Sequence, residues 1–253
     1  MGAPGAEDDW DFYPLLVDDA PASIMVNLAY RQVLPVPNYS EMAYVHLHMR
    51  QPREDGLSSN VEFETLSALD VALTGLVEAE GESLYVGRNT SGGCRDFYFY
   101  TRDAKRFERA AQNAMASFPA YEFELGTRPD ADWSTYTRFL YPSPNSMQRI
   151  QNRRVCDQLK QHGDDLTISR TIDHFATFGS ERAARTFADE CLAEGYQVAR
   201  VEQLDDHSGE WGVWFERSDK PSEIDDVVIP LFTRIAELEG NYDGWGCVAQ
   251  TPE

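Results

Sequence analysis

The chain has 253 residues, of which 42% are hydrophobic and 12% are aromatic, enough to fill the cores of two domains and to argue against disorder. The 43 acidic residues outnumber the 22 basic ones and give a net charge of −21, which excludes direct binding to a nucleic-acid backbone. No apolar run approaches the ~18–20 residues of a membrane helix. Residues 1–11 lack the basic and apolar regions of a signal peptide, so we expect a cytoplasmic protein without membrane contact.

The negative charge is divided evenly along the chain. There are 22 acids and 11 bases before Pro144, which give −11, and 21 acids and 11 bases after it, which give −10. Such a surface can serve solubility alone, or it can attract a basic nucleic-acid-binding protein. Acids gathered on one face of the second domain would favour docking, whereas an even spread would favour solubility.

In the first half, apolar spacing and turn residues predict strands and two helices. The predicted strands are 10–17, 23–30, 43–49, 84–88, 95–101 and 121–125, with a further candidate at 135–140. One predicted helix covers about 60–80, where four leucines spaced three and four apart form one face. The second begins near Asp103, an N-cap residue type, and ends at Pro119.

Two prolines in residues 141–146 predict a short, stiff linker, and therefore domains at 1–141 and 145–253. After the linker we expect helices over 146–162, over 180–192 and after Pro221 as far as Gly240. The strands expected in this half are 166–175, 196–204, 211–217 and 245–248.

Both halves therefore contain the order β-α-β-β-α-β, at 43–125 and at 166–248. This is the split βαβ, ferredoxin-like plan. The predicted fold class is α+β, with two tandem ferredoxin-like domains, each an antiparallel sheet with helices on one face.

Neither a cofactor nor a metal site is predicted. Residues 87–93 are rich in glycine but lie between two strands and lack the lysine of a phosphate-binding loop, so they predict a hairpin turn. His46 and His48 lie two apart on one strand face and could share a metal. The four cysteines form no zinc pattern, and no nearby carboxylate or cysteine completes the set at a known spacing. A structural role is favoured for both histidines.

Polar residues are densest in 163–175. Arg170, Ile172 and His174 share one face of the predicted strand, and Asp173 points the other way. Adjacent Asp173 and His174 therefore cannot form a catalytic dyad, and no serine or cysteine stands at a spacing that would support nucleophilic catalysis. A turn followed by a strand with one polar face is favoured over an acid/base site.

The segment 242–246, Tyr-Asp-Gly-Trp-Gly, closes the second domain. Asp243 and Gly244 predict a turn flanked by two aromatic residues. Buried anchoring of the C-terminal segment is favoured, and an exposed Tyr/Trp pair at a protein interface is the alternative.

Residues 163–165, 170–174, the helix from Ser180 and 242–246 together resemble the regulator of ribonuclease activity B (RraB) family, over about 152–247. In the first half, 55–57, 85–88 and 96–100 are similar to an uncharacterised bacterial family that often precedes an RraB-like domain, although Ser58 replaces its expected proline. The resemblance implies a ferredoxin-like domain and an acidic, non-enzymatic inhibitor that binds ribonuclease E and changes which RNAs it degrades. The residues that we expect to bind the partner are Asp164, Asp165, Arg170, His174, Tyr242, Asp243 and Trp245.

Three hypotheses follow from the sequence. The favoured one is a protein regulator whose acidic surface docks on the basic RNA-binding region of a ribonuclease or related protein. The second is a metal-dependent or acid/base enzyme built around His174 with Asp164, Asp165 and Arg170. The third is a dimerising structural module, which needs an exposed apolar patch.

Overall fold

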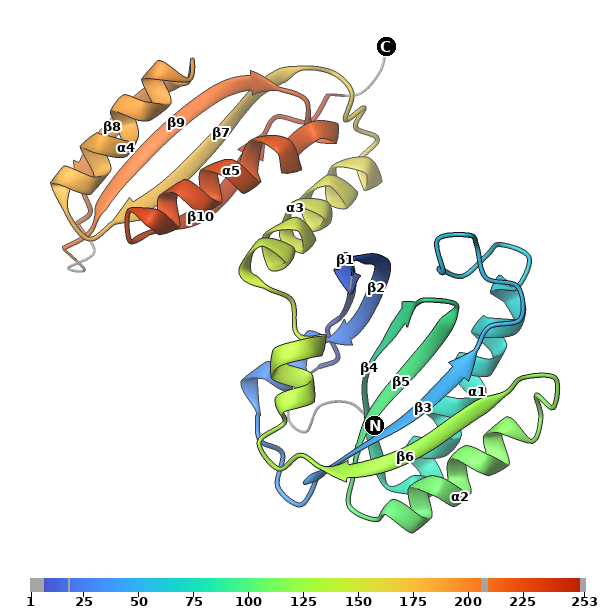
Figure 1. The fold of residues 1–253 in the computed structure, drawn as a ribbon. Coiled ribbons are helices and arrows are strands. Elements are labelled where there is room, and N and C mark those ends of the chain that lie inside the picture. Colours follow the sequence, from blue (N-terminus) through green and yellow to red (C-terminus); the bar gives the residue numbers. More distant parts are fainter. Residues whose placement is uncertain (1–6, 18, 206–208, 251–253) are drawn as a thin grey trace. The chain divides into compact units, whose positions relative to one another are not determined.

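The computed structural model describes residues 7–17, 19–205 and 209–250. The chain forms two compact units, Met1–Pro142 and Ser143–Glu253, and each has its own hydrophobic core (Figure 1). No helix in the described part of the chain is long and apolar enough to cross a membrane.

The first unit is a six-stranded antiparallel sheet with two long helices. Its elements are β1 (Trp10–Val17), β2 (Ala20–Asn27), β3 (Glu41–His48), α1 (Phe63–Gly81), β4 (Ser83–Ser91), β5 (Cys94–Thr101), α2 (Ala104–Met115) and β6 (Phe123–Pro129). The strand order is β1-β2-β4-β5-β3-β6. Its last four strands have the predicted ferredoxin-like arrangement, and the β1–β2 hairpin extends the sheet beside β4.

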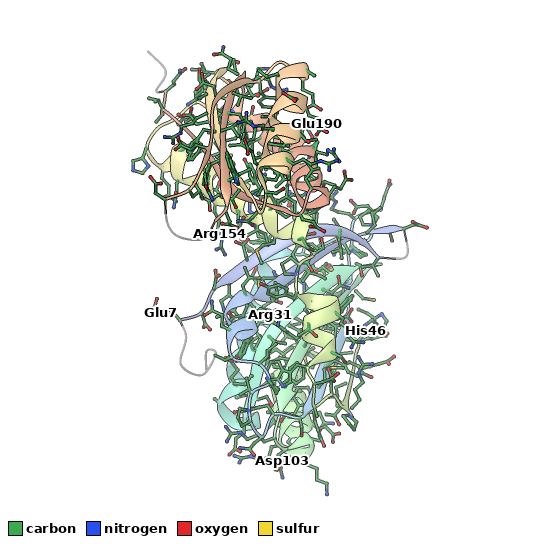
Figure 2. The ribbon with its side chains drawn as sticks, turned by 90° about the vertical axis from the view of Figure 1, so that its left-hand side faces the viewer. Glu7, Arg31, His46, Asp103, Arg154 and Glu190 are labelled. Atoms are coloured by element: carbon green, nitrogen blue, oxygen red, sulfur yellow. The ribbon has the colours of Figure 1, made fainter. Side chains whose placement is uncertain are left out.

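Helices α1 and α2 pack on one face of this sheet, as the leucine spacing predicts. The fully buried stripe of α1 consists of Leu66, Leu69, Leu73 and Val77. Asp103 caps α2 by accepting hydrogen bonds from the backbone of Lys105 and Arg106 at 3.0 and 3.1 Å, and it lies at one end of the unit (Figure 2).

The other face of the sheet carries an aromatic cluster at one end. Trp133 stacks on Tyr100 with ring centroids 3.7 Å apart, and Asp130 accepts hydrogen bonds from the Tyr100 hydroxyl and from the backbone of Thr135. These contacts correct one prediction: Tyr136–Leu140 is a short π-helical turn, not a strand. The buried residues Tyr136 and Leu140 are four apart, so a helical turn directs both into the core.

The second unit is a four-stranded antiparallel sheet. Its elements are α3 (Pro144–Gln161), β7 (Arg170–Phe178), α4 (Glu181–Ala193), β8 (Gln197–Gln203), β9 (Trp211–Asp219), α5 (Ile224–Glu237) and β10 (Gly240–Cys247). The order β10-β7-β9-β8 is ferredoxin-like. Helices α4 and α5 cover one face of the sheet, and α3 contacts α5 (Figure 1). The predicted α+β class is therefore correct for both units.

Several predicted strand boundaries and one predicted turn differ from the structure, among them the strand expected at 245–248, which begins at Gly240. The strand expected at 23–30 ends at Asn27, because its side chain caps a 3₁₀ turn at Leu28–Gln32. The strand expected at 166–175 begins only at Arg170, after a turn in which Asp165 accepts hydrogen bonds from Thr167. The expected turn at 242–244 is a bulge inside β10, where Gly244 adopts a φ of 140° that favours glycine.

Candidate functional site

The predicted site residues Asp164 and Arg170 form a buried ion pair in the second unit. Their side chains are only 0% and 3% exposed, and two N–H···O contacts of 2.5 and 3.0 Å join the guanidinium to the carboxylate. The hydrogen bond from Arg170 holds the pKa of the Asp164 carboxyl below its usual range. This pair is therefore ionised throughout the neutral pH range.

The same pair fixes the backbone around it. The guanidinium of Arg170 also donates to the carbonyl oxygens of Asp165 and Val248, at 2.6 and 3.3 Å. The carboxylate of Asp164 accepts from the backbone N–H of Gln250 at 2.6 Å. Asp164 and Arg170 thus join the turn before β7 to the segment after β10.

The side chain of His174 lies in the core beneath the helices. Its Nδ1 is 2.8 Å from the Tyr242 hydroxyl, and its ring stacks on Phe215 with centroids 5.1 Å apart. Burial lowers the pKa of His174 to about 4, so the ring is neutral at pH 7. No hydrogen bond among the described residues joins His174 to Asp164, Asp165 or Arg170, so the geometry of a shared acid/base site is not formed.

Four of the seven residues predicted to contact a partner are buried inside the unit. Asp164, Arg170, His174 and Tyr242 are each less than 9% exposed, so they cannot offer a surface to a docking protein. Trp245 is half-buried and donates from Nε1 to the side-chain oxygen of Asn152 on α3, at 3.0 Å. Asp165 is half-buried and Asp243 is exposed, and direct partner contact remains a prediction for these two and Trp245.

A different set of side chains is accessible on the sheet face opposite α4 and α5. We call it the open sheet face and define it by Asp173, Phe175, Arg200, Trp214 and Glu216, with Gly244 and Gly246 of β10. Phe175 stacks on Trp214 with centroids 4.5 Å apart, and the Arg200 guanidinium lies 3.7 Å from the Trp214 ring centroid. All five side chains are half-buried or exposed. An aromatic strip with a charged border is typical of protein interfaces.

Two carboxylates on this face stand directly opposite each other. Asp173 on β7 pairs with Glu216 on β9, and neither forms an ion pair with any residue that the structure describes. Like charges opposite one another across a sheet are destabilising, by roughly 0.2–1 kcal/mol. A cationic group from another molecule would relieve this repulsion, which makes the pair a candidate contact for a basic partner.

The glycines of the 242–246 segment leave the border of this face uncovered. Gly244 and Gly246 pair with Phe175 and Asp173 on the neighbouring strand. A Cβ atom built on either glycine meets no described atom within 4 Å. In the 242–246 segment, the two aromatic side chains therefore point to the core side of the sheet. The two glycines have no side chain that would cover the open sheet face.

The acids of the second unit are not confined to this face. Exposed Asp189 and Glu194 lie on and just after α4, on the helix side. Many helix-side acids are already paired, as Glu190 is with Arg234 through contacts of 2.6 and 2.8 Å. Acids therefore lie on both sides of the second unit, which by itself favours a role in solubility, and the Asp173–Glu216 arrangement is the local feature that favours docking.

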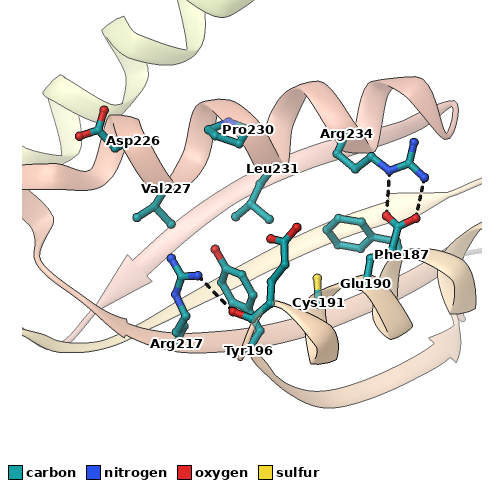
Figure 3. A pocket seen from close by; sticks show the side chains of 11 residues that line it. Phe187, Glu190, Cys191, Tyr196, Arg217, Asp226, Val227, Pro230, Leu231 and Arg234 are labelled. Carbon is teal, nitrogen blue, oxygen red and sulfur yellow. Dashed lines mark hydrogen bonds and ion pairs between the residues drawn. The ribbon is translucent and has the colours of Figure 1, made fainter.

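A groove of about 220 Å³ lies between α4 and α5 (Figure 3). Arg234 closes one end by pairing with Glu190, and Arg217 lies 4.2 Å from the Tyr196 ring centroid while it pairs with Asp219. Both arginines already have carboxylate partners. The groove is also lined by the acidic side chains of Glu194 and Asp226, but it lacks two carboxylates that stand directly opposite each other across a sheet.

The first unit holds a second pocket, of about 280 Å³, with three arginines among its lining residues. Arg88 and Arg95 share the single carboxylate of Asp70, and Arg53 pairs with Asp55. The Glu62 carboxylate also favours the charged form of Arg95, so nearby acids oppose the charges of the arginines that line this pocket.

Comparison with known proteins separates the two units. Residues 8–141 match a family of unknown function, DUF695, and residues 149–247 match the family described as regulator of ribonuclease activity B. A relative of that name from Sodalis glossinidius is 32% identical over 110 residues, which cover 42% of this chain and 75% of the relative. The chain belongs to both families, one in each unit.

Further RraB relatives are more distant. The protein from Proteus mirabilis is 29% identical over 39% of this chain and 72% of its own length, and that from Escherichia coli is 26% identical over 44% and 83%. A solved structure of an unknown protein from Galdieria sulphuraria aligns over 81% of this chain and 96% of its own, with 11% identity and a TM-score of 0.23. That score is too low to support an argument.

The sequence identified the motif of the RraB unit. It also predicted that the side chains of this motif contact a partner, although four of them are buried. The open sheet face was missed because its members come from β7, β8, β9 and β10 and meet only through strand register. One available signal was the alternation in residues 170–178, which puts Asp173 and Phe175 on the face opposite His174.

Proposed function

We propose that the chain regulates a ribonuclease by direct protein contact, and that the open sheet face of the RraB unit is the contact surface. Membership of the RraB family supports a regulatory role, since the relatives carry that role in their name. The observation that carries the choice of surface is the unpaired Asp173–Glu216 arrangement beside the Phe175–Trp214 pair.

The partner that fits this surface is a basic segment of the ribonuclease. Its arginine or lysine side chains would lie between the two carboxylates and above the aromatic rings, where both charge attraction and cation–π contact favour a cation. Ribonuclease E, the target that the RraB resemblance implies, is the first candidate. An RNA-binding region must be basic to hold phosphates, so an acidic protein can compete for it.

The same charge argues against a homodimer through this face. Two copies would bring four of these carboxylates together around two aromatic pairs, and the Arg200 of each copy already pairs with its own Glu202 at 3.1 Å. Regulation by a monomer of the chain is therefore the simpler proposal, and a solution mass measurement tests it.

The experiment uses the full chain and purified ribonuclease E. We expect the chain to bind the ribonuclease and to change the rate or the products of RNA cleavage. Binding should weaken from low to physiological ionic strength, because charge attraction is screened over about 8 Å at the higher salt. Failure to bind ribonuclease E at low ionic strength would remove this enzyme as the partner and leave the proposal without its first candidate.

A further inference from the structure

A group of side chains that can bind a metal lies on the first unit's sheet, near the turn between β4 and β5. His46 and His48 of β3 point to the face opposite α1 and α2, because the intervening residues Val45 and Leu47 are fully buried in the core beneath those helices. Figure 2 shows His46 at the surface of the unit. The two imidazole rings meet edge to face, with centroids 4.8 Å apart.

Strand register supplies the ligand that sequence spacing did not reveal. In the β3–β5 ladder, His48 pairs with Cys94 and His46 pairs with Asp96. One possible ligand atom from each of His46, His48 and Cys94 lies within 4.8 Å of the other two. The sequence spacing of His46 and His48 could not reveal these neighbours, because Cys94 and Asp96 come from the adjacent strand.

The separation of the sulfur from one imidazole nitrogen fits a shared tetrahedral ion. A zinc ion bonded to sulfur at about 2.3 Å and to nitrogen at about 2.1 Å holds those two atoms roughly 3.6 Å apart when the angle at the metal is tetrahedral. In this protein the Cys94 Sγ lies 3.6 Å from Nδ1 of His48.

Asp96 supplies the supporting contact that metal-binding histidines require. Its carboxylate accepts a close hydrogen bond from Nδ1 of His46, and the amide of Asn89 lies 3.5 Å from its other oxygen. A carboxylate on one ring nitrogen fixes the histidine tautomer and directs the other nitrogen, here Nε2, to a metal. The arrangement therefore contains both the ligands and their orienting group.

We propose that His46, His48 and Cys94 bind a zinc ion, with Asp96 as the positioning residue. Imidazole and thiolate donors are the set that zinc prefers. His48 is exposed and the other two ligands are half-buried, so solvent supplies the fourth ligand. This site lies in the DUF695 unit and is independent of the ribonuclease proposal.

The test uses the full chain after removal of metal with a chelator, and titration with zinc alone and with cobalt alone. We expect one zinc ion per chain by calorimetry. Bound cobalt should show the absorption bands of tetrahedral geometry and the charge-transfer band of a cobalt–thiolate bond. Cys94→Ser should abolish the charge-transfer band and weaken zinc binding at least tenfold, and His48→Ala should weaken it comparably.

Two further sets of variants make the result specific. Asp96→Asn should retain the charge-transfer band while zinc affinity falls about 10- to 100-fold. Cys247→Ser and His162→Ala, at a half-buried cysteine and an exposed histidine of the second unit, should bind zinc like the wild type. Circular dichroism of the metal-free variants checks their folding. If Cys94→Ser does not fold, His48→Ala, at an exposed ligand, replaces it as the test of zinc affinity. A wild-type chain that binds no zinc, or variants of the ligands that bind it normally, would overturn the proposal.

Discussion

At the scale of single residues, the RraB motif contains two buried polar interactions with different charge states. Asp164 and Arg170 are ionised and paired, whereas His174 is neutral and shares a hydrogen bond with Tyr242. Both interactions are enclosed by the core of the second unit, so we expect their loss to change stability before it changes any surface contact.

The Asp164→Asn variant tests the ion pair. It leaves the buried Arg170 guanidinium without a balancing charge, and we expect the free energy of unfolding to fall by about 3 kcal/mol. Urea unfolding monitored by circular dichroism measures the change. Asp157→Asn, at an exposed position of α3, serves as the control and should change stability by less than about 0.5 kcal/mol. Equal stability of Asp164→Asn and wild type would contradict a structural role for the pair.

His174 gives the protein a predictable dependence on acid. Its folded-state pKa of about 4 lies below the ordinary value of 6.5, so between these pH values the unfolded chain binds the proton more readily. Its contribution to stability is complete above pH 6.5 and is lost as the pH falls toward 4, by about 3 kcal/mol in all.

Urea unfolding across this pH range measures that loss. In His174→Gln, the fall in stability between pH 6.5 and 4 should be smaller than in the wild type. His162→Gln, which changes an exposed histidine, should retain the wild-type slope. An unchanged slope in His174→Gln would show that His174 is not the buried titrating group.

At the scale of helices and strands, burial on one side of each element produces the sequence pattern, so most of the fold could be predicted. The stripe of α1 and the alternation in β7 identified those elements correctly. Thr135–Leu140 was misassigned because a short apolar segment fits a strand or a helical turn equally well until Trp133 and Asp130 fix its neighbours.

The open sheet face and the candidate zinc site could not be predicted in the same way, because both depend on the register between neighbouring strands. Neither the Asp173–Glu216 pair nor the His48–Cys94 pair has a characteristic spacing in the chain. The distinctive residues of the RraB motif, by contrast, proved to be those that hold its own fold together. A motif thus revealed the family but not the side chains that lie on its surface.

The edge strand β10 provides a steric test of the open sheet face. Gly246→Leu places a side chain beside Asp173, in space that no described atom fills. We expect weaker ribonuclease binding with unchanged or slightly higher thermal stability, since leucine suits a strand better than glycine. Gly179→Leu, at another glycine with open space around it, should bind normally. Normal binding by Gly246→Leu would exclude this border from the contact.

At the scale of the whole molecule, the two units carry separate chemistry. Each has its own core and its own complete ferredoxin-like sheet. The candidate zinc ligands belong to the first unit, and the open sheet face belongs to the second. The two proposed sites therefore lie in different units, whereas the acidity is common to both.

A fragment comprising residues 143–253 tests this division. We expect it to unfold cooperatively on its own, because all core residues of the second unit lie within it. It should bind the ribonuclease with an affinity close to that of the full chain, and it should not bind zinc. Thermal unfolding and the two binding assays measure these outcomes. Loss of ribonuclease binding in a folded fragment would assign part of the contact to the first unit.

The measurement that tests the central claim most directly compares the ribonuclease affinities of two double variants with equal net charge. Asp173→Asn with Glu216→Gln removes the facing carboxylates, and Asp189→Asn with Glu194→Gln removes two exposed acids from the helix side. The first variant should bind at least tenfold more weakly, about 1.4 kcal/mol, without loss of thermal stability, and the second should bind like the wild type. Equal weakening of both, or of neither, would contradict docking on the open sheet face.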